Sequence, residues 1–242
     1  MMRSMKTLKK KLNEYFSQFV YGSIDGTVTT FAVVAGSYGA GIGPKFVLIL
    51  GVANLVGDGF SMAASAYVSR RSEQQQKVLS EKRYHTWYAN SDARVSSSLR
   101  NHFMKDYGFE GKLLEDAESV ALQDENKVIR HLMHNEFGML GGDDSKLAAL
   151  KIATATFAGF VVAGSVPLVT YIIGLGVSMS TQAMFYISLI LTAVTFATIG
   201  YLKGRVTGTS HLKSLVETLL LGSIAALLAY GLGNVLTAAI KA

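Results

Sequence analysis

Long apolar runs separated by short links make up most of this chain, and one longer polar stretch interrupts them. Each run reaches the roughly 20 residues that a helix needs to cross a bilayer. The predicted spans are Phe16 to Ile42, Phe46 to Ser69, Leu147 to Gly174, Met184 to Leu202 and Leu215 to Leu236. This pattern predicts an all-α, multi-pass integral membrane protein with five transmembrane helices and with termini on opposite sides. Gly22 and Gly26 have the spacing that lets helices approach closely, and Pro167 should kink the third span.

The polar stretch at residues 70–146 predicts a helical cytoplasmic insert between transmembrane helices 2 and 3. Its first helix should continue the second span from Arg70 to about Tyr88. Further helices are expected at Ser91 to Tyr107, Lys112 to Leu122 and Glu125 to Phe137, with glycines between them. The chain thus divides into an N-terminal lead with helices 1 and 2 at residues 1–69, the insert at 70–146, and helices 3 to 5 at 147–242.

Basic residues predict the orientation of this topology and account for the net charge of +6. Of the 23 lysines and arginines, 20 lie before the first span, in the insert, or between the fourth and fifth spans. These segments share one side of a five-span protein, and the positive-inside rule makes that side cytoplasmic. The N-terminus is therefore expected in the cytoplasm. A nucleic-acid partner has no remaining support, whereas membrane lipid is an expected partner.

The residue types also limit the chemistry. The chain has no cysteine, so disulfides, thiolate metal sites and cysteine nucleophiles are excluded. It has no phosphate-binding glycine loop with Lys and Ser/Thr, no HExxH and no nucleophile elbow. We therefore expect neither an enzyme nor a cofactor, and any bound metal must be held by oxygen, imidazole or thioether groups.

Two carboxylates, Asp25 and Asp58, fall inside the first two spans, where lipid makes a charge costly. At 1.5 Å per residue, they lie about 14 and 17 Å from the cytoplasmic ends of their spans, at nearly the same depth. Asn54 and Met62 stand one turn on either side of Asp58 and share its helix face. These four residues are the predicted transport pathway, although a methionine in a membrane helix usually serves packing.

The insert carries further possible metal ligands at helical spacings. Glu81 with His85, and Glu115 with Glu118, are neighbours one turn apart, and such pairs can chelate a cation. The candidate ligands are Glu73, Glu81, His85, Glu115, Glu118, Met133 and Glu136, with His131 and His134 beside them. The competing interpretation is an ordinary solvated helix face.

Two long motifs resemble the vacuolar iron transporter family. They are DGTVTTFAVVAG, which begins at Asp25, and ANLVGDGFSMAASAYVSRRSE, which begins at Ala53. Two further motifs are similar to the family's closing metal-domain helix and its last span. They are HLMHNEFGM, which begins at His131, and LVETLLLGSIAALLAYGLGNVL, which begins at Leu215.

The resemblance implies a homodimer of five-helix subunits with a metal path between the first two helices of both subunits. It also implies export of Fe²⁺, often with Mn²⁺, from the cytoplasm in exchange for protons. The family pattern places Asp25, Asn54, Asp58 and Met62 on the path, and Met133 and Glu136 in a cytoplasmic domain that gathers divalent metal. The chain carries Ala66 where the family usually has a glutamate, and Asn135 where a second acid is common.

These observations lead to the hypothesis of a proton-coupled transporter that exports Fe²⁺ or Mn²⁺ from the cytoplasm. Carboxylates suit borderline divalent cations, and a thioether favours a transition metal over Mg²⁺ or Ca²⁺. Two carboxyl groups that hold protons without metal could release them as one divalent ion binds. The alternatives are a membrane-anchored metal sensor or scaffold without transport, and a transporter of another divalent cation. The short termini favour a prokaryotic plasma membrane over a vacuolar membrane.

Overall fold

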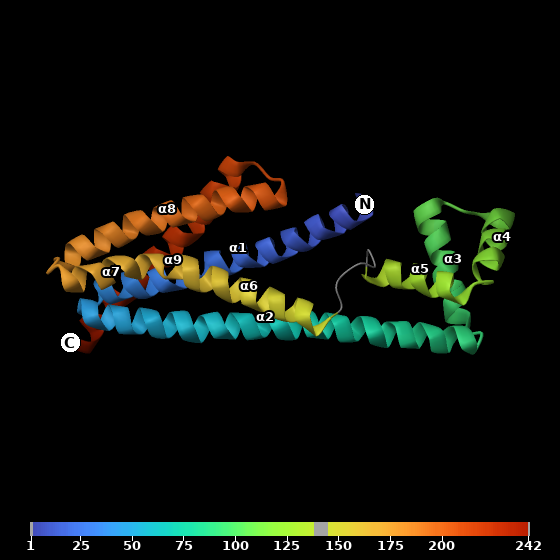
Figure 1. The fold of residues 1–242 in the computed structure, drawn as a ribbon, viewed down its shortest axis with the longest axis horizontal. Coiled ribbons are helices and arrows are strands. Elements are labelled where there is room, and N and C mark those ends of the chain that lie inside the picture. The colour runs from blue at the N-terminus through green and yellow to red at the C-terminus, as the bar shows by residue number, and fades with distance from the viewer. Residues whose placement is uncertain (1, 138–144, 242) are drawn as a thin grey trace. The chain divides into compact units, whose positions relative to one another are not determined.

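The computed structural model describes the backbone of residues 2–137 and 145–241 and the side chains of 13–137, 145–205 and 207–240. The described residues form helices α1 to α9 and no strand, which confirms the all-α prediction (Figure 1). The chain divides into a membrane unit, made from Met1–Val68 and Leu147–Ala242, and an insert unit, made from Ser69–Lys146.

The membrane unit holds the long apolar helices. They are α1 (Met2–Gly39), the first part of α2 (Pro44–Ala89), α6 (Lys146–Gly164), α7 (Val166–Gly176), α8 (Thr181–Thr207) and α9 (His211–Lys241). Five of them, all except the short α7, are long and apolar enough to cross a membrane, which confirms the five predicted spans. α1 packs against α8 and α9, and α8 also packs against α7 and α9 (Figure 1).

The third predicted span is two helices rather than one kinked helix. α6 ends at Gly164 and α7 begins at Val166, so Pro167 lies in the first turn of α7. Proline breaks a helix interior because it lacks an N–H and its ring clashes with the preceding turn, but neither effect matters at a helix start. The break therefore falls at Ser165. The Ser188 hydroxyl of α8 donates to the Pro167 carbonyl at 2.7 Å and holds α7 against α8.

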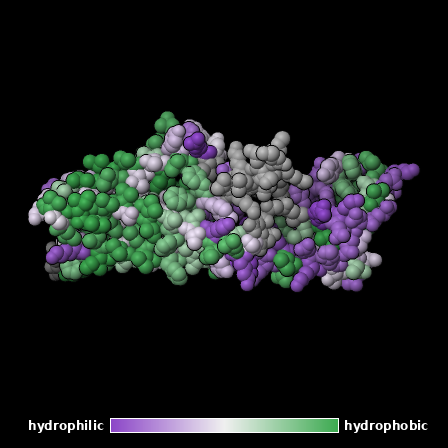
Figure 2. Space-filling view, viewed as in Figure 1, coloured by the Kyte–Doolittle hydropathy of each residue, from purple (hydrophilic) through white to green (hydrophobic). Residues whose placement is uncertain are grey.

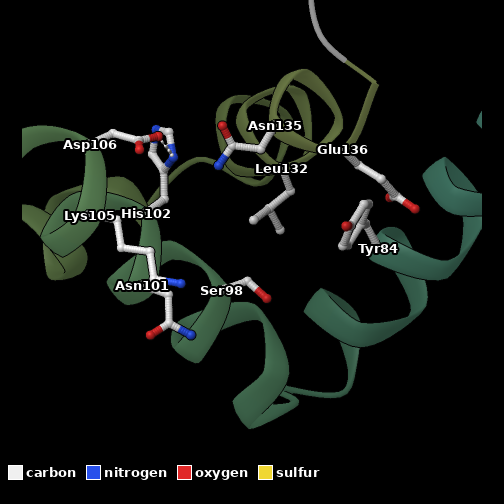
Figure 3. Close-up of a pocket in the computed structure, with 9 residues that line it drawn as sticks. All are labelled: Tyr84, Ser98, Asn101, His102, Lys105, Asp106, Leu132, Asn135 and Glu136. Atoms are coloured by element: carbon white, nitrogen blue, oxygen red, sulfur yellow. Dashed lines mark ion pairs between the residues drawn. The ribbon is translucent and has the colours of Figure 1, made fainter.

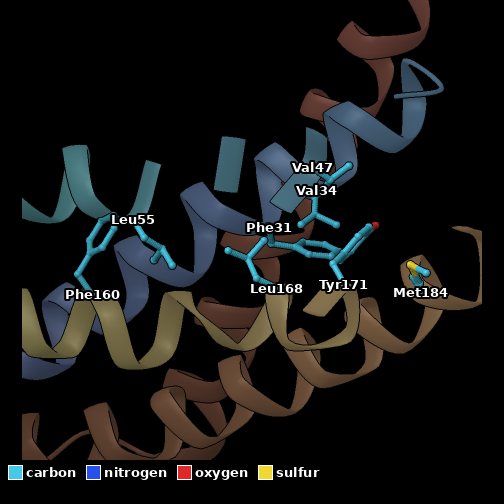
Figure 4. Packing of buried hydrophobic residues seen from close by; sticks show 8 residues of the cluster. All are labelled: Phe31, Val34, Val47, Leu55, Phe160, Leu168, Tyr171 and Met184. Atoms are coloured by element: carbon cyan, nitrogen blue, oxygen red, sulfur yellow. The ribbon is translucent and has the colours of Figure 1, made fainter. Parts of the chain in front are cut away.

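A buried cluster from five helices forms the core of the membrane unit (Figure 4). Its members are Phe31, Val34, Val47, Leu55, Phe160, Leu168, Tyr171 and Met184. Leu55 of α2 lies beside Phe160 of α6 in Figure 4, and Phe31 of α1 lies beside Tyr171 of α7. Because lipid tails are as apolar as these side chains, van der Waals packing holds such a core together. The packing fixes α2 against the bundle beside the predicted pathway residues.

α1 and α6 approach each other closely at paired glycines. A Cβ atom on Gly22 would collide with the Thr156 carbonyl, and one on Gly26 would collide with the Phe160 carbonyl. On the facing helix, a Cβ atom on Gly159 would collide with the backbone of α1. The close approach predicted from the four-residue glycine spacing is confirmed.

The insert unit combines the end of α2 with α3 (Ala93–Tyr107), α4 (Gly111–Ala121) and α5 (Glu125–Phe137). The prediction that its first helix continues the second span is confirmed, since α2 runs unbroken to Ala89. α3 begins two residues later than predicted, because Ser91 has a left-handed φ of 50° and Asp92 caps the helix. The Asp92 side chain accepts a hydrogen bond from the Arg94 N–H, which would otherwise lack a partner.

The insert has its own hydrophobic core between α2, α3 and α5. This core contains Tyr84, Val95, Leu99, Val128, Ile129, Leu132 and Met133. Trp87, the only tryptophan in the chain, packs edge-on against Tyr84 with ring centroids 5.6 Å apart. The Arg94 guanidinium lies 4.1 Å from the centre of the Trp87 ring. The environment of Trp87 therefore reports on the integrity of the insert.

The surfaces of the two units differ in character. In Figure 2, most of the visible surface of the membrane unit is hydrophobic, and the visible surface of the insert is mostly hydrophilic. A soluble protein rarely exposes so large an apolar surface, whereas a lipid-facing one must.

Candidate functional site

The two intramembrane acids lie on neighbouring helices of the membrane unit. Asp25 is half-buried on α1, and Asp58 is exposed on α2. A hydrogen bond between Asn54 of α2 and Thr29 of α1 joins the two helices beside these acids. The structure thus places on neighbouring helices the two acids that the sequence predicts at similar depth, and their part in transport stays a prediction.

A hydroxyl group connects Asp25 to Asn54. Thr29 lies one turn after Asp25 on α1, and its Oγ1 donates to the Asp25 backbone carbonyl at 2.9 Å. The Asn54 amide nitrogen of α2 donates to the same Thr29 oxygen at 3.4 Å. Sequence reasoning missed Thr29, although its spacing of four residues from Asp25 was a usable signal.

Met62, the predicted thioether ligand, lies near Asp58 and also contacts the core of the membrane unit. It follows Asp58 by one helical turn on α2 and is half-buried. Its side chain packs against the membrane core cluster. The packing role that methionine usually has in membrane helices is therefore present, and a ligand role for the thioether remains a prediction.

The membrane-spanning part of α2 exposes several large apolar side chains. Phe46, Ile49, Val56 and Phe60 are 64, 63, 62 and 70% exposed. Asp58 is exposed on the same helix, but a spacing of two residues puts its side chain on the side of α2 opposite Val56 and Phe60. An exposed carboxylate in a membrane span faces either lipid, at high cost, or something that covers it.

Two glutamates of the insert have basic partners within it. Glu136 accepts a hydrogen bond from the Arg83 guanidinium at 3.0 Å. Glu118 is almost fully buried, accepts a hydrogen bond from the Ser96 hydroxyl, and lies 3.5 Å from the Arg100 guanidinium. A cation that bound either carboxylate would have to displace an arginine.

The other predicted insert ligands do not converge either. Glu73 pairs with Arg70 at 3.1 Å, and the Nδ1 atom of His85 lies 2.7 Å from the Glu125 carboxylate. Met133 is in the core of the insert and only 5% exposed. These side chains serve packing and charge pairing inside the insert.

Glu81 and Glu115 are exposed on α2 and α4. Within the described residues, no three histidine, aspartate or glutamate side chains are arranged to hold a metal ion. The structure therefore does not gather the predicted insert ligands into a site.

Basic partners lower the pKa of two aspartates in the insert. The Arg94 guanidinium, hydrogen-bonded to Asp92, lowers the pKa of that carboxyl to about 2. The Lys127 ammonium group lowers the pKa of Asp124 in the same way. Both acids are ionised at neutral pH and have a basic partner.

A pair of histidines lies between α3 and α5. His102 Nδ1 pairs with the Asp106 carboxylate at 2.6 Å, and the His102 and His131 ring centroids are 4.3 Å apart. The His131 Nε2 atom is buried without a hydrogen-bond partner among the described residues. Burial lowers the pKa of His131, and the neighbouring His102 and His134 lower it further, while Asp106 opposes them. The His131 ring is therefore neutral at pH 7.

A pocket of about 470 Å³ opens in the insert between α2, α3 and α5 (Figure 3). Its walls are Tyr84, Ser98, Asn101, His102, Lys105, Asp106, Leu132, Asn135 and Glu136. Figure 3 shows Asp106 with His102 at one side and Glu136 near Tyr84 at the other. The two carboxylates of the pocket do not face one another as a metal site would require.

The fold and the pathway residues together define a class of protein. Five membrane-spanning helices with carboxylates inside the first two are typical of multi-pass transporters, because intramembrane acids mark ion and proton pathways. The sequence profile of the VIT family matches residues 16–234, which is most of the chain. The chain belongs to this family, and it is a transporter family member rather than an enzyme.

Several curated relatives agree with the family assignment. The chain is 29% identical over 221 residues to a protein named vacuolar iron transporter from Plasmodium falciparum (isolate 3D7), covering 90% of this chain and 80% of the relative. It is 27% identical to one of that name from Toxoplasma gondii (strain ATCC 50861 / VEG), covering 93% and 75%. It is 25% identical to vacuolar iron transporter 1 of Arabidopsis thaliana, covering 92% and 86%.

Proposed function

We propose that this protein exports Fe²⁺ or Mn²⁺ from the cytoplasm across a membrane in exchange for protons. The observation that carries the proposal is the placement of Asp25 and Asp58 on two membrane-spanning helices that the Asn54–Thr29 hydrogen bond links. The relatives' name, vacuolar iron transporter, supports iron as a substrate.

The residues near the acids support this choice of cargo. Asn54 and Asp58 add an amide and a second carboxylate to Asp25, and Met62 adds a thioether one turn away. Oxygen ligands suit divalent cations in general, and the sulfur atom favours a transition metal. Two neighbouring carboxylates in a membrane cannot easily both stay charged, so either protons or one divalent cation must neutralise them. Competition between these two states couples the metal to protons.

A homodimer accounts for the exposure of Asp58 on α2. A charged side chain facing hydrocarbon costs at least about 2.5 kcal/mol, so lipid is an unfavourable environment for the Asp58 carboxylate. If a second copy covers Asp58, the carboxylate lies in an interface together with Ser61 and Ser65, which are also exposed on that side of α2. The metal path would then run between the first two helices of both subunits.

The orientation follows from charge. Residues 1–15, the insert, and the facing ends of α8 and α9 hold most lysines and arginines, which favours the cytoplasm for all three. Metal would then enter the pathway from the side of the insert. We propose a prokaryotic plasma membrane as the location of the protein. The alternative is a vacuolar membrane, and microscopy of the labelled protein would distinguish the two.

Transport in liposomes tests the proposal directly. Fe²⁺ uptake by the purified wild-type protein should depend on an imposed pH gradient and vanish in Asp58→Asn. The matched control is Glu217→Gln, because Glu217 is an exposed carboxylate near the start of α9 that pairs with Lys203 at 3.2 Å. The control should retain most of the transport.

Two results would redirect the proposal. Gradient-dependent uptake of Mn²⁺ or Zn²⁺ in place of Fe²⁺ would retain the mechanism and change the cargo. No uptake of any of these ions by the intact wild type would favour the hypothesis of a metal sensor or scaffold. The ion pairs of Glu118 and Glu136 with arginines argue against metal sensing by the insert, because these carboxylates already have basic partners.

A further inference from the structure

The hydrogen bond that the Thr29 hydroxyl donates within α1 limits how this group can interact with α2. A hydroxyl has one proton to donate and two lone pairs to accept with. The Thr29 proton is used by the Asp25 carbonyl, which lies 2.9 Å away within α1. Toward α2, the Thr29 oxygen can therefore act only as an acceptor.

This restriction selects the orientation of the Asn54 side chain. An asparagine amide presents an NH₂ group on one side and a carbonyl oxygen on the other. The Asn54 NH₂ group faces Thr29 Oγ1 at 3.4 Å, since only a donor can meet that acceptor. The Asn54 carbonyl oxygen is consequently turned away from Thr29. A cation is attracted to this oxygen and repelled by the NH₂ group.

We propose that Thr29 is a positioning residue that holds the Asn54 amide with its oxygen available to the transported divalent cation. Thr29 does not touch the cation itself. The same hydroxyl bonds the Asp25 backbone carbonyl, so it ties Asn54 on α2 to the turn of α1 that carries Asp25. The inference rests on the proposed function, because it assigns Thr29 to the same pathway.

The test compares three variants for Fe²⁺ uptake into liposomes at a fixed pH gradient. Thr29→Val keeps the shape of the side chain and removes the hydroxyl, and Thr29→Ser keeps the hydroxyl. Thr30→Val is the matched control, since the buried Thr30 hydroxyl next in sequence has no hydrogen-bond partner among the described residues. If Thr29→Val does not fold, Thr29→Ala removes the same hydroxyl.

The KM for Fe²⁺ should rise roughly three- to tenfold in Thr29→Val, the effect of one lost neutral hydrogen bond. The maximal rate and the dependence of uptake on pH should stay unchanged, because the carboxylates remain. Thr29→Ser should restore the wild-type KM within about twofold, and Thr30→Val should not change it.

Equal KM values in Thr29→Val and Thr30→Val, beside an active wild type, would overturn the role of Thr29 and leave the proposed function intact. A lower maximal rate with unchanged KM would also overturn it, since it would indicate a role in helix packing. If the wild type itself moves no metal, the proposed function fails and the inference about Thr29 fails with it.

Discussion

Truncation of Met133 distinguishes a packing role from a metal-binding role in the insert. The side chain is 5% exposed and lies in a core cluster with residues of α2, α3 and α5. Met133→Ala leaves a cavity that three packed helices cannot easily close, and such a change costs about 2–5 kcal/mol of the free energy of unfolding. Met133→Leu nearly conserves the volume and should cost less than about 1.5 kcal/mol.

Urea unfolding of the full-length protein in detergent measures these free energies. Fluorescence of Trp87, the only tryptophan, reports the insert alone. Met104→Ala is the control, because Met104 is 48% exposed on α3 and its truncation should leave the midpoint unchanged. The reasoning is refuted if Met133→Leu keeps wild-type stability but raises the KM for Fe²⁺ as much as Met133→Ala does. That result would make the thioether a metal ligand.

Two further predictions concern packing and pH. Gly26→Ala should destabilise the membrane unit by about 1–3 kcal/mol, because the new Cβ collides with the Phe160 carbonyl. The control Gly231→Ala, with open space around it, should not lower the melting temperature in detergent. Equal melting temperatures of the two variants would contradict the close approach of α1 and α6. Burial lowers the pKa of His131 below its ordinary 6.5, so its neutral form stabilises the insert fully above pH 6.5, and this stabilisation is lost as the pH falls below that value. Urea midpoints followed by Trp87 fluorescence should therefore fall less between pH 7.5 and 5.5 in His131→Gln than in the wild type, and an unchanged pH dependence would rule out this role of the ring.

The spans were predictable because length and apolar composition alone decide whether a helix can cross a bilayer. The continuation of α2 into the insert was predictable for a similar reason, since no glycine or proline interrupts residues 70–89. The third span was harder. Pro167 indicated a disturbance, but whether the helix bends or restarts depends on neighbours such as Ser188, which binds the Pro167 carbonyl from another helix.

The site was only partly predictable. Asp25 and Asp58 stand out in the sequence because a charge in a membrane span is rare and costly. The partners of the insert glutamates could not be read from spacing, because Arg83 and Glu136 are 53 residues apart in the chain. Helical spacing paired Glu81 with His85, whereas in the folded insert the His85 ring pairs with a glutamate of α5.

The central claim is that one metal ion exchanges for protons at the two intramembrane acids, and metal-driven proton movement tests it most directly. Liposomes that hold the protein would carry a pH-sensitive dye inside, with the membrane potential clamped and no pH gradient imposed. Addition of Fe²⁺ outside should make the lumen more alkaline as metal enters and protons leave, and Asp25→Asn and Asp58→Asn should both abolish the signal. Fe²⁺ uptake by the wild type without any change in lumenal pH would contradict the account.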